Sequence, residues 1–375
     1  MYLKRLELKN FRNYQDLDLN FSDNINIIHG ENAQGKTNLL ESIYFLAITK
    51  SHRSFIDNNL IKNDKNFFKI KAELVTKNFT KQFELMFNEK NKKFIIDKKE
   101  IKVTSDYLSN INVIIFYPED LDIIKNSPNI RRRYLDIEIG QLDKKYLKVL
   151  SEYNKLLKIR NDMLKSNLKN NDLNINYLYS IDEHLVDRAS KIHHMRNKFI
   201  TKINEILPDI YKNITSTDKI YLNYIPSDNI LMGDIEIKEK FHKLLELKRS
   251  NDIKIGRTSV GPHLDDFNFI YMEKDLKYFG SQGQQRAAVL SLKLSEIKIF
   301  KNHTGETPIL LLDDVFSELD ENKRNNLLKY INKDVQTIIT TTDINLVSKE
   351  LLQKSNIIKI KNGQIQKREG DQNGK

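Results

Sequence analysis

The feature that most constrains this chain is a glycine-rich segment at residues 30–37, with the sequence GENAQGKT. An apolar run at residues 25–28 precedes it, and apolar side chains at helical spacing follow at residues 39–47. The segment matches the Walker A pattern G-x-x-x-x-G-K-[ST], whose glycines let backbone N–H groups close around phosphates. The N-terminus of the following helix adds positive charge at the same place. The order of strand, loop and helix therefore predicts a nucleotide-binding fold.

The residues of this loop have separate expected roles. Lys36 is expected to contact the β- and γ-phosphates of ATP, and Thr37 to offer its hydroxyl to Mg²⁺. ATP with Mg²⁺ is therefore the expected cofactor. We expect the nucleotide to be bound by Gly30, Glu31, Asn32, Ala33, Gln34, Gly35, Lys36 and Thr37.

A second apolar run, residues 309–312, ends in Asp313 and Asp314. This is the form of a Walker B strand, which delivers its carboxylates to the edge of a sheet beside the phosphates. Asp313 is expected to hold Mg²⁺ directly or through water, and Asp314 to orient the attacking water as a general base. Alone, the same residues could be a strand followed by an acidic turn.

A Ser-x-Gly-Gln element just before a helical pattern resembles the signature motif of ABC-type ATPases. It consists of Ser281, Gly283 and Gln284, and Gln284 lies 29 residues before Asp313. A serine hydroxyl and backbone amides at a helix N-terminus suit a γ-phosphate, so Ser281 is a catalytic candidate and all three are nucleotide-binding candidates. In that superfamily the signature meets the nucleotide of the opposite protomer, which implies an ATP-dependent homodimer. The alternative is an ordinary helix cap.

A four-residue segment and one single position can also be compared with that superfamily. Ser317-Glu318-Leu319-Asp320 matches the D-loop that follows Walker B. Thr342 stands where ABC transporters usually carry a switch histidine. The histidine of the transporters is therefore missing.

The remaining patterns predict an α/β fold. We expect an ABC-type P-loop ATPase head with mixed sheets and flanking helices, into which a helical lever arm is inserted. Residues 129–207 have helical spacing with a polar turn at 166–174, which predicts two antiparallel helices of about 40 Å each. Strand-like runs lie at 17–21, 25–28, 67–75, 83–87, 94–103, 111–116, 267–271, 309–312 and 335–339, and strand signals return after Asn251. The expected parts are residues 1–120 and 253–367 for the two halves of the head, 121–252 for the insert and 368–375 for a flexible tail.

The amino-acid composition limits the classes of partner and the cellular compartment that are expected. The net charge of +11 favours an anionic partner such as nucleic acid, although the Lys, Asn and Ile content of AT-biased genomes could produce much of it. Cysteine is absent, which excludes a disulfide scaffold and cysteine-ligated metals. No stretch approaches the roughly 20 apolar residues of a membrane span, and the first ten residues lack a secretory signal. We expect a cytoplasmic protein without a membrane partner.

Four further segments resemble the RecF family of SMC-like ABC ATPases. They are residues 8–14, then 118–121 with 127–136, then 258–266, and finally 311–327. Asn126 departs from the family pattern, which usually has Gly there. The resemblance implies an ATP-dependent DNA-binding protein of replication and recombinational repair. It implies slow hydrolysis, action at single-strand gaps, and RecR, RecO and the recombinase RecA as partners.

The DNA-contacting residues are less determined. Arg131, Arg132 and Arg133 begin a helix, where the dipole disfavours cations, so either a phosphate partner or acidic residues of the fold must balance them. Arg12 could contact nucleotide or DNA, or form a structural ion pair. His263 is expected to be structural, and Asp265 and Asp266 have no assigned role.

Three other functions remain open at this point. They are the ATPase subunit of an ABC transporter, a small-molecule kinase with a P-loop, and a nucleotide-dependent scaffold that barely hydrolyses ATP. The missing switch histidine weakens the first, and the signature and D-loop weaken the second.

Overall fold

The computed structural model describes residues 1–375 except 216, 228–233, 319–322, 325, 328–333 and 367–375. Its contacts divide the chain into two compact units. Unit 1 contains Met1–Asp120, Ile210–Thr217 and Val289–Lys375, and unit 2 contains Leu121–Asp209 and Asp218–Ala288. By contacts, residues 253–288 group with unit 2, and the division into domains at 120, 252 and 367 stays a prediction.

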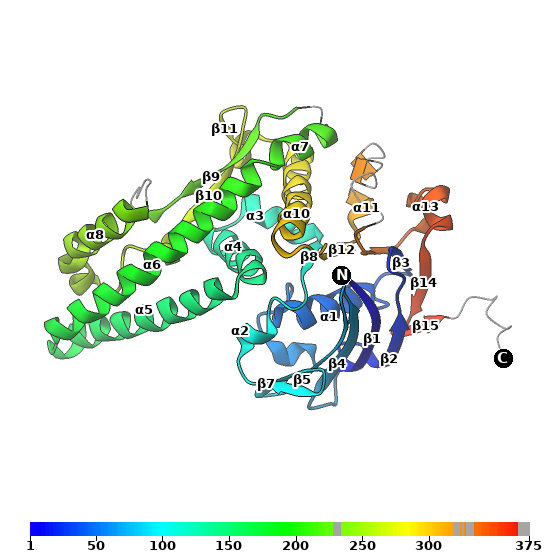
Figure 1. Cartoon of the computed structure of the whole chain (residues 1–375), viewed down its shortest axis with the longest axis horizontal. Helices are drawn as coiled ribbons and strands as arrows, with labels where there is room; N and C mark the ends of the chain where they lie inside the picture. The colour runs from blue at the N-terminus through cyan, green and yellow to red at the C-terminus, as the bar shows by residue number, and fades with distance from the viewer. Residues whose placement is uncertain (216, 228–233, 319–322, 325, 328–333, 367–375) are drawn as a thin grey trace. The chain divides into compact units, whose positions relative to one another are not determined.

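The α/β class and the mixed sheets are confirmed, and unit 1 contains two six-stranded sheets (Figure 1). The first sheet is antiparallel throughout, in the order β2-β1-β4-β5-β6-β7. Its strands are β1 Tyr2–Phe11, β2 Tyr14–Asn20, β4 Phe68–Val75, β5 Thr80–Asn88, β6 Asn91–Ile96 and β7 Lys99–Ile101. One expectation was wrong in detail. The run at residues 94–103 is a hairpin, because Asp97 and Lys98 have left-handed φ angles of 47° and 66° and reverse the chain.

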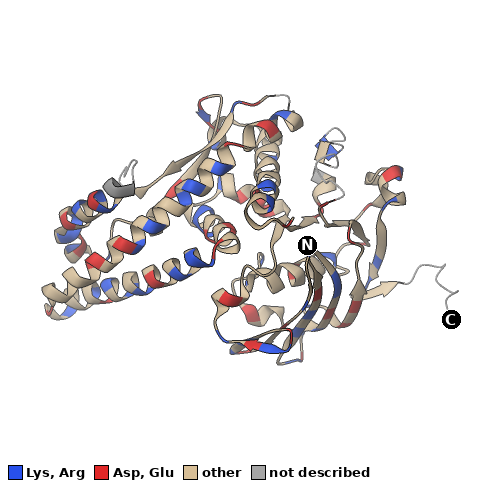
Figure 2. Cartoon of the chain, viewed as in Figure 1, with Lys and Arg blue, Asp and Glu red and all other residues tan. Residues whose placement is uncertain are grey.

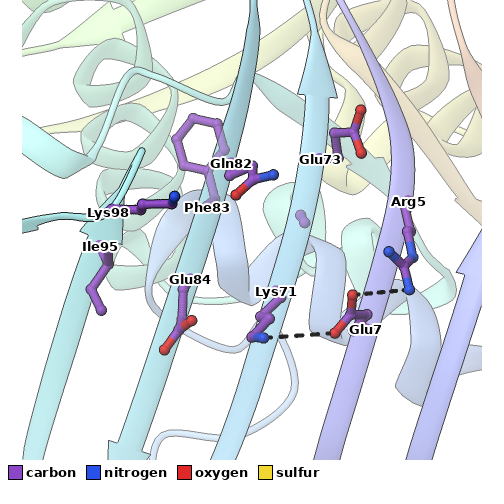
Figure 3. Close-up of a pocket in the computed structure, with 10 residues that line it drawn as sticks. Arg5, Glu7, Lys71, Glu73, Gln82, Phe83, Glu84, Ile95 and Lys98 are labelled. Carbon is purple, nitrogen blue, oxygen red and sulfur yellow. Dashed lines mark ion pairs between the residues drawn. The ribbon is translucent and has the colours of Figure 1, made fainter.

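One face of this sheet carries charged ladders. A hollow of about 520 Å³ lies on it, lined by side chains of neighbouring strands (Figure 3). Arg5 and Lys71 approach Glu7 at 3.2 Å and 3.9 Å. These pairs are exposed, so this face of the sheet is turned to solvent. Exposed ion pairs contribute little to stability.

The second sheet has the order β15-β14-β3-β13-β12-β8, and all its pairs are parallel except β14 with β15. Its strands are β3 Ile25–His29, β8 Val113–Phe116, β12 Ile309–Asp313, β13 Thr337–Thr341, β14 Asn356–Lys361 and β15 Gln364–Gln366. The central strands β12 and β13 are buried along their whole length, as parallel strands covered on both faces are. Helix α1, Lys36–Ile48, follows β3 and buries 11 of its residues.

Unit 2 is mainly helical, with a small antiparallel sheet of order β11-β10-β9. Its longer helices are α4 Pro128–Leu142, α5 Lys144–Asn170, α6 Ile175–Asn204 and α8 Asp234–Ile255, and its strands are β9 Ile220–Ile225, β10 Asp266–Tyr271 and β11 Lys274–Asp275. Helices α5 and α6 pack side by side, as the sequence predicted (Figure 1). Asn171, with a φ of 53°, ends α5, and Asn174 caps the start of α6.

Three details of unit 2 differ from expectation. Asp143 separates α4 from α5, because its carboxylate accepts a bond from the N–H of Lys145 and starts a new helix. Helix α8 continues to Ile255, where strand signals were expected after Asn251, and packs against both α5 and α6. Strand β9 was not predicted, although buried Ile220 and Leu222 alternate with exposed neighbours.

A buried ion network holds α5, α6 and α8 together. Arg160 of α5 is fully buried and donates to Asp182 of α6 and Asp252 of α8, each at 2.7 Å. It also donates to the Thr258 hydroxyl at 2.9 Å. Removing the arginine would leave buried Asp252 without its cation and Asp182 with Arg249 alone, at 3.1 Å. Loss of one partner of a buried ion pair is strongly destabilising in general.

The shorter elements connect these parts. Across the described residues, no helix combines the length and the apolar composition that crossing a bilayer requires. Helix α10, Gln282–Thr304, is long at 23 residues. The shorter elements are η1 Asp57–Leu60, α2 Thr104–Tyr107, η2 Pro118–Leu121, α3 Asp122–Lys125, α7 Leu207–Thr215, η4 Pro262–Leu264, α9 Leu276–Phe279, α11 Val315–Glu318, η5 Ile344–Leu346 and α13 Lys349–Gln353.

Asp120 is a buried carboxyl group at the end of unit 1's first segment. It accepts a hydrogen bond from the backbone N–H of Tyr117 at 3.0 Å. Burial raises the pKa of Asp120 to about 7, against the opposing charge of Lys293. The folded state therefore holds a proton that the unfolded chain releases near pH 4. This group's contribution to stability is greatest below about pH 4 and is lost as pH rises to about 7.

We therefore predict that Asp120→Asn becomes relatively more stabilising as pH rises. Asn keeps an acceptor for Tyr117 but cannot ionise. The difference in unfolding free energy between variant and wild type should increase by on the order of 2 kcal/mol from pH 5 to pH 8. Urea denaturation at both pH values measures it, with exposed Glu119→Gln as the control. An equal difference at both pH values would rule out a buried, neutral Asp120.

Candidate nucleotide site

Three parallel strands bring the expected site residues of unit 1 to one sheet edge. β13 pairs with β3 on one side and with β12 on the other. Asp313 at the end of β12 is in register with Thr340, and Thr341 is in register with His29 at the end of β3. The loop after β3 and the two aspartates at the end of β12 therefore converge, as ligand sites at carboxyl ends of parallel strands do.

The loop requires its two glycines. Gly35 has a φ of 112°, and a Cβ there would lie 2.5 Å from Nδ2 of Asn13. A Cβ on Gly30 would collide with the backbone oxygen of Ile360. Both positions combine restricted space with backbone angles that only glycine adopts without strain.

Two turns of the neighbouring strands hold the loop. The amide of Asn13, in the β1–β2 turn, donates to the Gln34 carbonyl at 3.1 Å. The backbone N–H of Gly363, in the β14–β15 turn, donates to the same carbonyl at 3.0 Å. Tyr14 donates its hydroxyl to the Gly35 carbonyl at 2.9 Å. The loop shape is thus fixed by protein contacts on both sides.

The side chain of Lys36 folds back across the loop. Its Nζ donates to the carbonyl oxygens of Gly30 and Glu31, each at 2.7 Å. Burial lowers the pKa of Lys36, while the carboxylates of Asp314 and Asp313 oppose that shift. The ammonium group is therefore held inside the curve of the loop, where a phosphate-binding lysine is needed.

Thr37 and Asp313 meet at the position expected for magnesium. The Thr37 hydroxyl donates to Oδ1 of Asp313 at 3.0 Å, and the Thr340 hydroxyl donates to the same atom at 2.6 Å. Burial raises the pKa of Asp313, and the two hydroxyl bonds oppose that shift. A hydroxyl beside a carboxylate supplies the hard oxygen ligands that Mg²⁺ prefers, so these residues fit the ion.

Asp314 lies next to this pair in a strained backbone conformation. Its φ is 50°, and its N–H donates to the Thr340 hydroxyl at 3.0 Å. Its Oδ1 is buried and has no hydrogen-bond partner among the described residues. An unpaired buried oxygen on a strained residue is costly, and such groups gather at functional sites. This is the arrangement expected of a group that accepts a hydrogen bond from an attacking water.

The signature residues lie in unit 2 at the start of α10. The backbone N–H of Ser281 donates to Oε1 of Gln284 at 2.8 Å, and the N–H of Gln284 donates to the Ser281 hydroxyl at 3.2 Å. This reciprocal pair is a capping box, so the helix-cap alternative is realised in the geometry. Ser281 is exposed and Gly283 is half-buried, so the helix N-terminus remains accessible.

Sequence reasoning missed two residues that position these motifs. Buried Gln285 donates its amide to the carbonyl oxygens of Leu276 and Lys277, at 3.0 and 3.3 Å, and ties α9 to α10. The Thr340 hydroxyl contacts both Asp313, the last residue of β12, and Asp314, which follows it. A run of threonines after an apolar strand was visible in the sequence, but which of them faces Asp313 depends on register.

The D-loop and switch positions are only partly described. The Ser317 hydroxyl donates to the Asp314 carbonyl at 2.7 Å. Leu319 and Asp320 lie outside the described residues. Thr342 is exposed just after β13.

Two DNA-binding candidates are engaged within the fold. Arg12 forms a two-bond ion pair with Glu41, both bonds at 2.8 Å, and Glu41 is fully buried. Arg131 is buried and pairs with Asp266 at 2.5 and 2.9 Å. For these two, the structural ion-pair alternative is present, and their contact with DNA stays a prediction.

The second and third arginines of the run lie in the same region. Arg132 donates to the backbone oxygen of Asp265 at 2.7 Å, and burial lowers its pKa. Arg132 and Arg133 are both half-buried. Their role toward DNA also stays a prediction.

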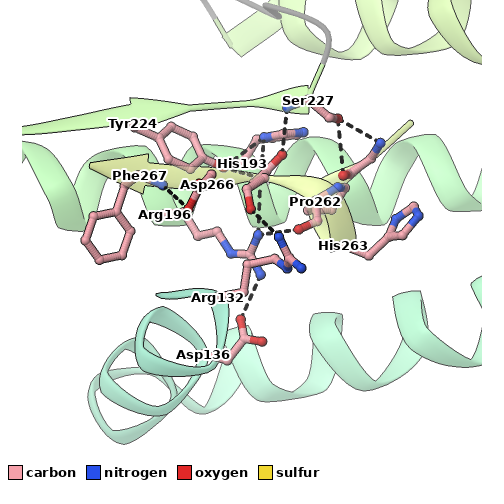
Figure 4. A network of polar contacts seen from close by, with 12 residues as sticks. Arg132, Asp136, His193, Arg196, Tyr224, Ser227, Pro262, His263, Asp266 and Phe267 are labelled. Carbon is pink, nitrogen blue, oxygen red and sulfur yellow. Dashed lines mark hydrogen bonds and ion pairs between the residues drawn. The ribbon is translucent and has the colours of Figure 1, made fainter. Parts of the chain in front are cut away.

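Asp265, which had no assigned role, is buried at the centre of a polar network. Figure 4 labels its partners His193, Arg196 and Tyr224. Asp265 accepts bonds from Arg196 at 3.1 Å and from the Tyr224 hydroxyl, and His193 lies 3.2 Å away. Burial raises the pKa of Asp265, but the bonds from His193 and Arg196 outweigh burial and hold it below the ordinary value. Arg196 also donates to Asp136 at 2.9 Å. The network connects α4, α6 and β9 to the segment before β10.

His263 is part of the same packing. Its Nδ1 lies 2.6 Å from the Tyr153 hydroxyl, and burial lowers its pKa. A neutral, hydrogen-bonded ring between α5 and the segment before β10 fits the structural role expected for it.

Comparisons with known proteins match nearly the whole chain. Residues 2–367 match the family model described as RecF/RecN/SMC N terminal domain. The chain is 40% identical over 368 residues to proteins named DNA replication and repair protein RecF from Bacillus cytotoxicus and Bacillus thuringiensis, covering 97% of this chain and 98% of each relative.

Solved structures agree with these relatives. The recombination mediator protein RecF with ATP, of the RecFOR pathway, is 34% identical, with a TM-score of 0.90 over 97% of both chains. The same mediator with ATPrS has a TM-score of 0.89 over 98% of both chains. An SMC head bound to the winged-helix domain of ScpA, at 14% identity and a TM-score of 0.54, covers 98% of this chain and shares the fold.

We predict that Thr340→Val impairs ATP hydrolysis while leaving the fold intact. Valine keeps the shape but removes the hydroxyl that orients Asp313 and receives the N–H of Asp314. Losses of this kind typically reduce activity or metal affinity about 10- to 100-fold. Phosphate release measured across a Mg²⁺ titration checks this.

Thr341→Val is the matched control. Thr341 is the next residue on the same strand, and its hydroxyl donates to the Asp343 carbonyl at 2.9 Å. Removing this hydroxyl should leave the rate of hydrolysis within about threefold of wild type, because it bonds neither Asp313 nor Asp314. Equal losses in both variants would contradict a specific role for Thr340.

Proposed function

Since the chain belongs to the RecF family of SMC-like ATPases, a family of DNA replication and repair, we propose that it is a recombination mediator whose DNA binding is gated by ATP. It would act at single-strand gaps and promote loading of the recombinase. The observation that carries the proposal is the convergence of Lys36, Thr37, Asp313 and Asp314 at one sheet edge.

The residues of unit 1 supply the ATPase chemistry. Lys36 would neutralise the terminal phosphates, and Thr37 and Asp313 would hold Mg²⁺. Asp314 would accept a hydrogen bond from the attacking water. We propose slow turnover linked to DNA, because an ATP clamp works through the different affinities of its open and closed states.

The signature supports a composite site between two copies. Ser281, Gly283 and Gln284 present a helix N-terminus to a γ-phosphate of the opposite protomer. Two ATP molecules would then lie at the interface of a homodimer. Association would therefore depend on nucleotide.

The partners follow from the same family. The solved relatives are mediators of the RecFOR pathway, so RecO and RecR are the proposed protein partners and RecA the recombinase that benefits. Gapped DNA with a single- to double-strand junction is the proposed nucleic acid. A protein that acts on such DNA in a bacterium works in the cytoplasm.

We predict that Mg-ATP tightens binding to a gapped duplex and that Lys36→Ala abolishes this effect. The variant loses the ammonium that contacts the phosphates, so the closed state is no longer favoured. Fluorescence anisotropy of a labelled gapped duplex, with and without Mg-ATP, measures it. Affinity should fall with added salt, as phosphate contacts require.

Lys50→Ala is the control for this experiment. Lys50 is exposed just beyond α1, so its removal changes the net charge equally. It should keep the ATP effect. A wild-type protein that ignores DNA in every nucleotide state would contradict the proposed function.

A further inference from the structure

Helix α5 carries a large share of the chain's positive charge. Its 27 residues contain eight Lys or Arg and two Asp or Glu, whereas the whole chain has a net charge of +11. The neighbouring α6 has five cations and three acids over 30 residues. Figure 2 shows the blue segments recurring along α5. The excess is therefore concentrated on one element of unit 2.

Most of these lysines share one face of the helix. At 100° per residue they fall within an arc of about 100°, over a length of about 38 Å. All six are exposed. We call this set the lysine ridge, and it consists of Lys144, Lys148, Lys155, Lys158, Lys165 and Lys169.

The protein balances the lysine ridge only in small part, because Asp162 is the one acid of α5 within the same arc and faces six lysines. Within the part of the chain that the structure describes, none of its six ammonium groups forms an ion pair or a hydrogen bond. By contrast, Arg188 and Lys191 on α6 pair with Glu152 and Asp187. Lys144 also lies in the first turn of α5, where the helix dipole disfavours a cation. Helix stability alone does not account for this arrangement.

A groove adjoins the N-terminal end of the ridge. It has a volume of about 730 Å³ between α5 and α6. Lys148 belongs to both the ridge and the groove, and Lys145 and His194 also line it. A cationic hollow continuous with a cationic ridge gives an extended surface that an anionic polymer can follow.

We propose that the lysine ridge binds the phosphate backbone of duplex DNA, an inference that rests on the proposed DNA-binding function and adds a surface to it. A length of about 38 Å matches about 11 base pairs at 3.4 Å each. Lysines on flexible stems suit phosphates that are contacted without reading sequence. An acidic protein is the less suitable partner, because the centre of a protein interface is normally apolar and the ridge is formed by lysines.

The test replaces four ridge lysines with Gln and compares them with four matched lysines elsewhere in unit 2. The ridge variant changes Lys155, Lys158, Lys165 and Lys169. The control variant changes Lys198, Lys238, Lys243 and Lys254, which are exposed on α6 and α8. Both lose four charges, and Gln preserves helix propensity. Circular dichroism verifies that both fold.

Anisotropy of a labelled 20-base-pair duplex in Mg-ATP, at several salt concentrations, reads the outcome. The ridge variant should bind at least about tenfold more weakly at 0.1 M salt, and its slope of log affinity against log salt should be shallower by about 3 to 4. The control variant should stay within about threefold of wild type. Equal losses in the two variants, or none in the ridge variant, would overturn the proposal.

Two further arms test whether the partner is an acidic protein and whether the chain binds DNA at all. If the ridge variant loses binding of labelled polyglutamate but keeps duplex binding, the partner is an acidic protein and the proposal is overturned. Duplex binding by Lys36→Ala is measured alongside, as the variant in which binding should not respond to ATP. A wild-type protein whose duplex binding responds to ATP, combined with a ridge variant equal to the control, refutes the ridge alone. Absence of DNA binding by wild type refutes the proposed function as well.

Discussion

The parallel pairing of β13 between β3 and β12 is the contact on which the site depends. It places Thr37, after β3, 3.0 Å from Asp313 at the end of β12, although the two are 276 residues apart. The first antiparallel sheet and the β14–β15 turn then support the loop through Asn13 and Gly363. The chain leaves this sheet to build unit 2 and returns to it. The nucleotide site therefore exists only when both ends of the chain pair in one sheet.

Much of this arrangement could be predicted from short stretches of the sequence. The glycine-rich loop, its flanking strand and helix, and the strand ending in two aspartates depend on short-range chemistry that a single sequence displays. Helices α5 and α6 were predictable because their apolar side chains recur at helical spacing over many turns. The charge of α5 was also visible, although which lysines share a face becomes useful only once the helix bounds are known. The family resemblance added the expected partners, which no local pattern displays.

Features that depend on long-range packing were not predictable. Thr340 matters because register places its hydroxyl against Asp313, and nothing in the threonine run marks it. Arg131 and Asp265 belong to ion pairs whose partners are distant in sequence, so neighbouring charges alone left their roles open. Helix α8 buries one side against α5 and α6, and its short apolar pattern competes with the strand signals beside it. In each case tertiary contacts, rather than local preference, decided the outcome.

The central claim is that Asp314 activates water at an ATP site assembled by three parallel strands. The most direct measurement is single-turnover ATP hydrolysis by Asp314→Asn, with binding of a fluorescent ATP analogue measured in parallel and the exposed Asp343→Asn as control. Loss of a general base predicts at least about 100-fold slower hydrolysis with nucleotide affinity retained. Hydrolysis at the wild-type rate would contradict this account of the site.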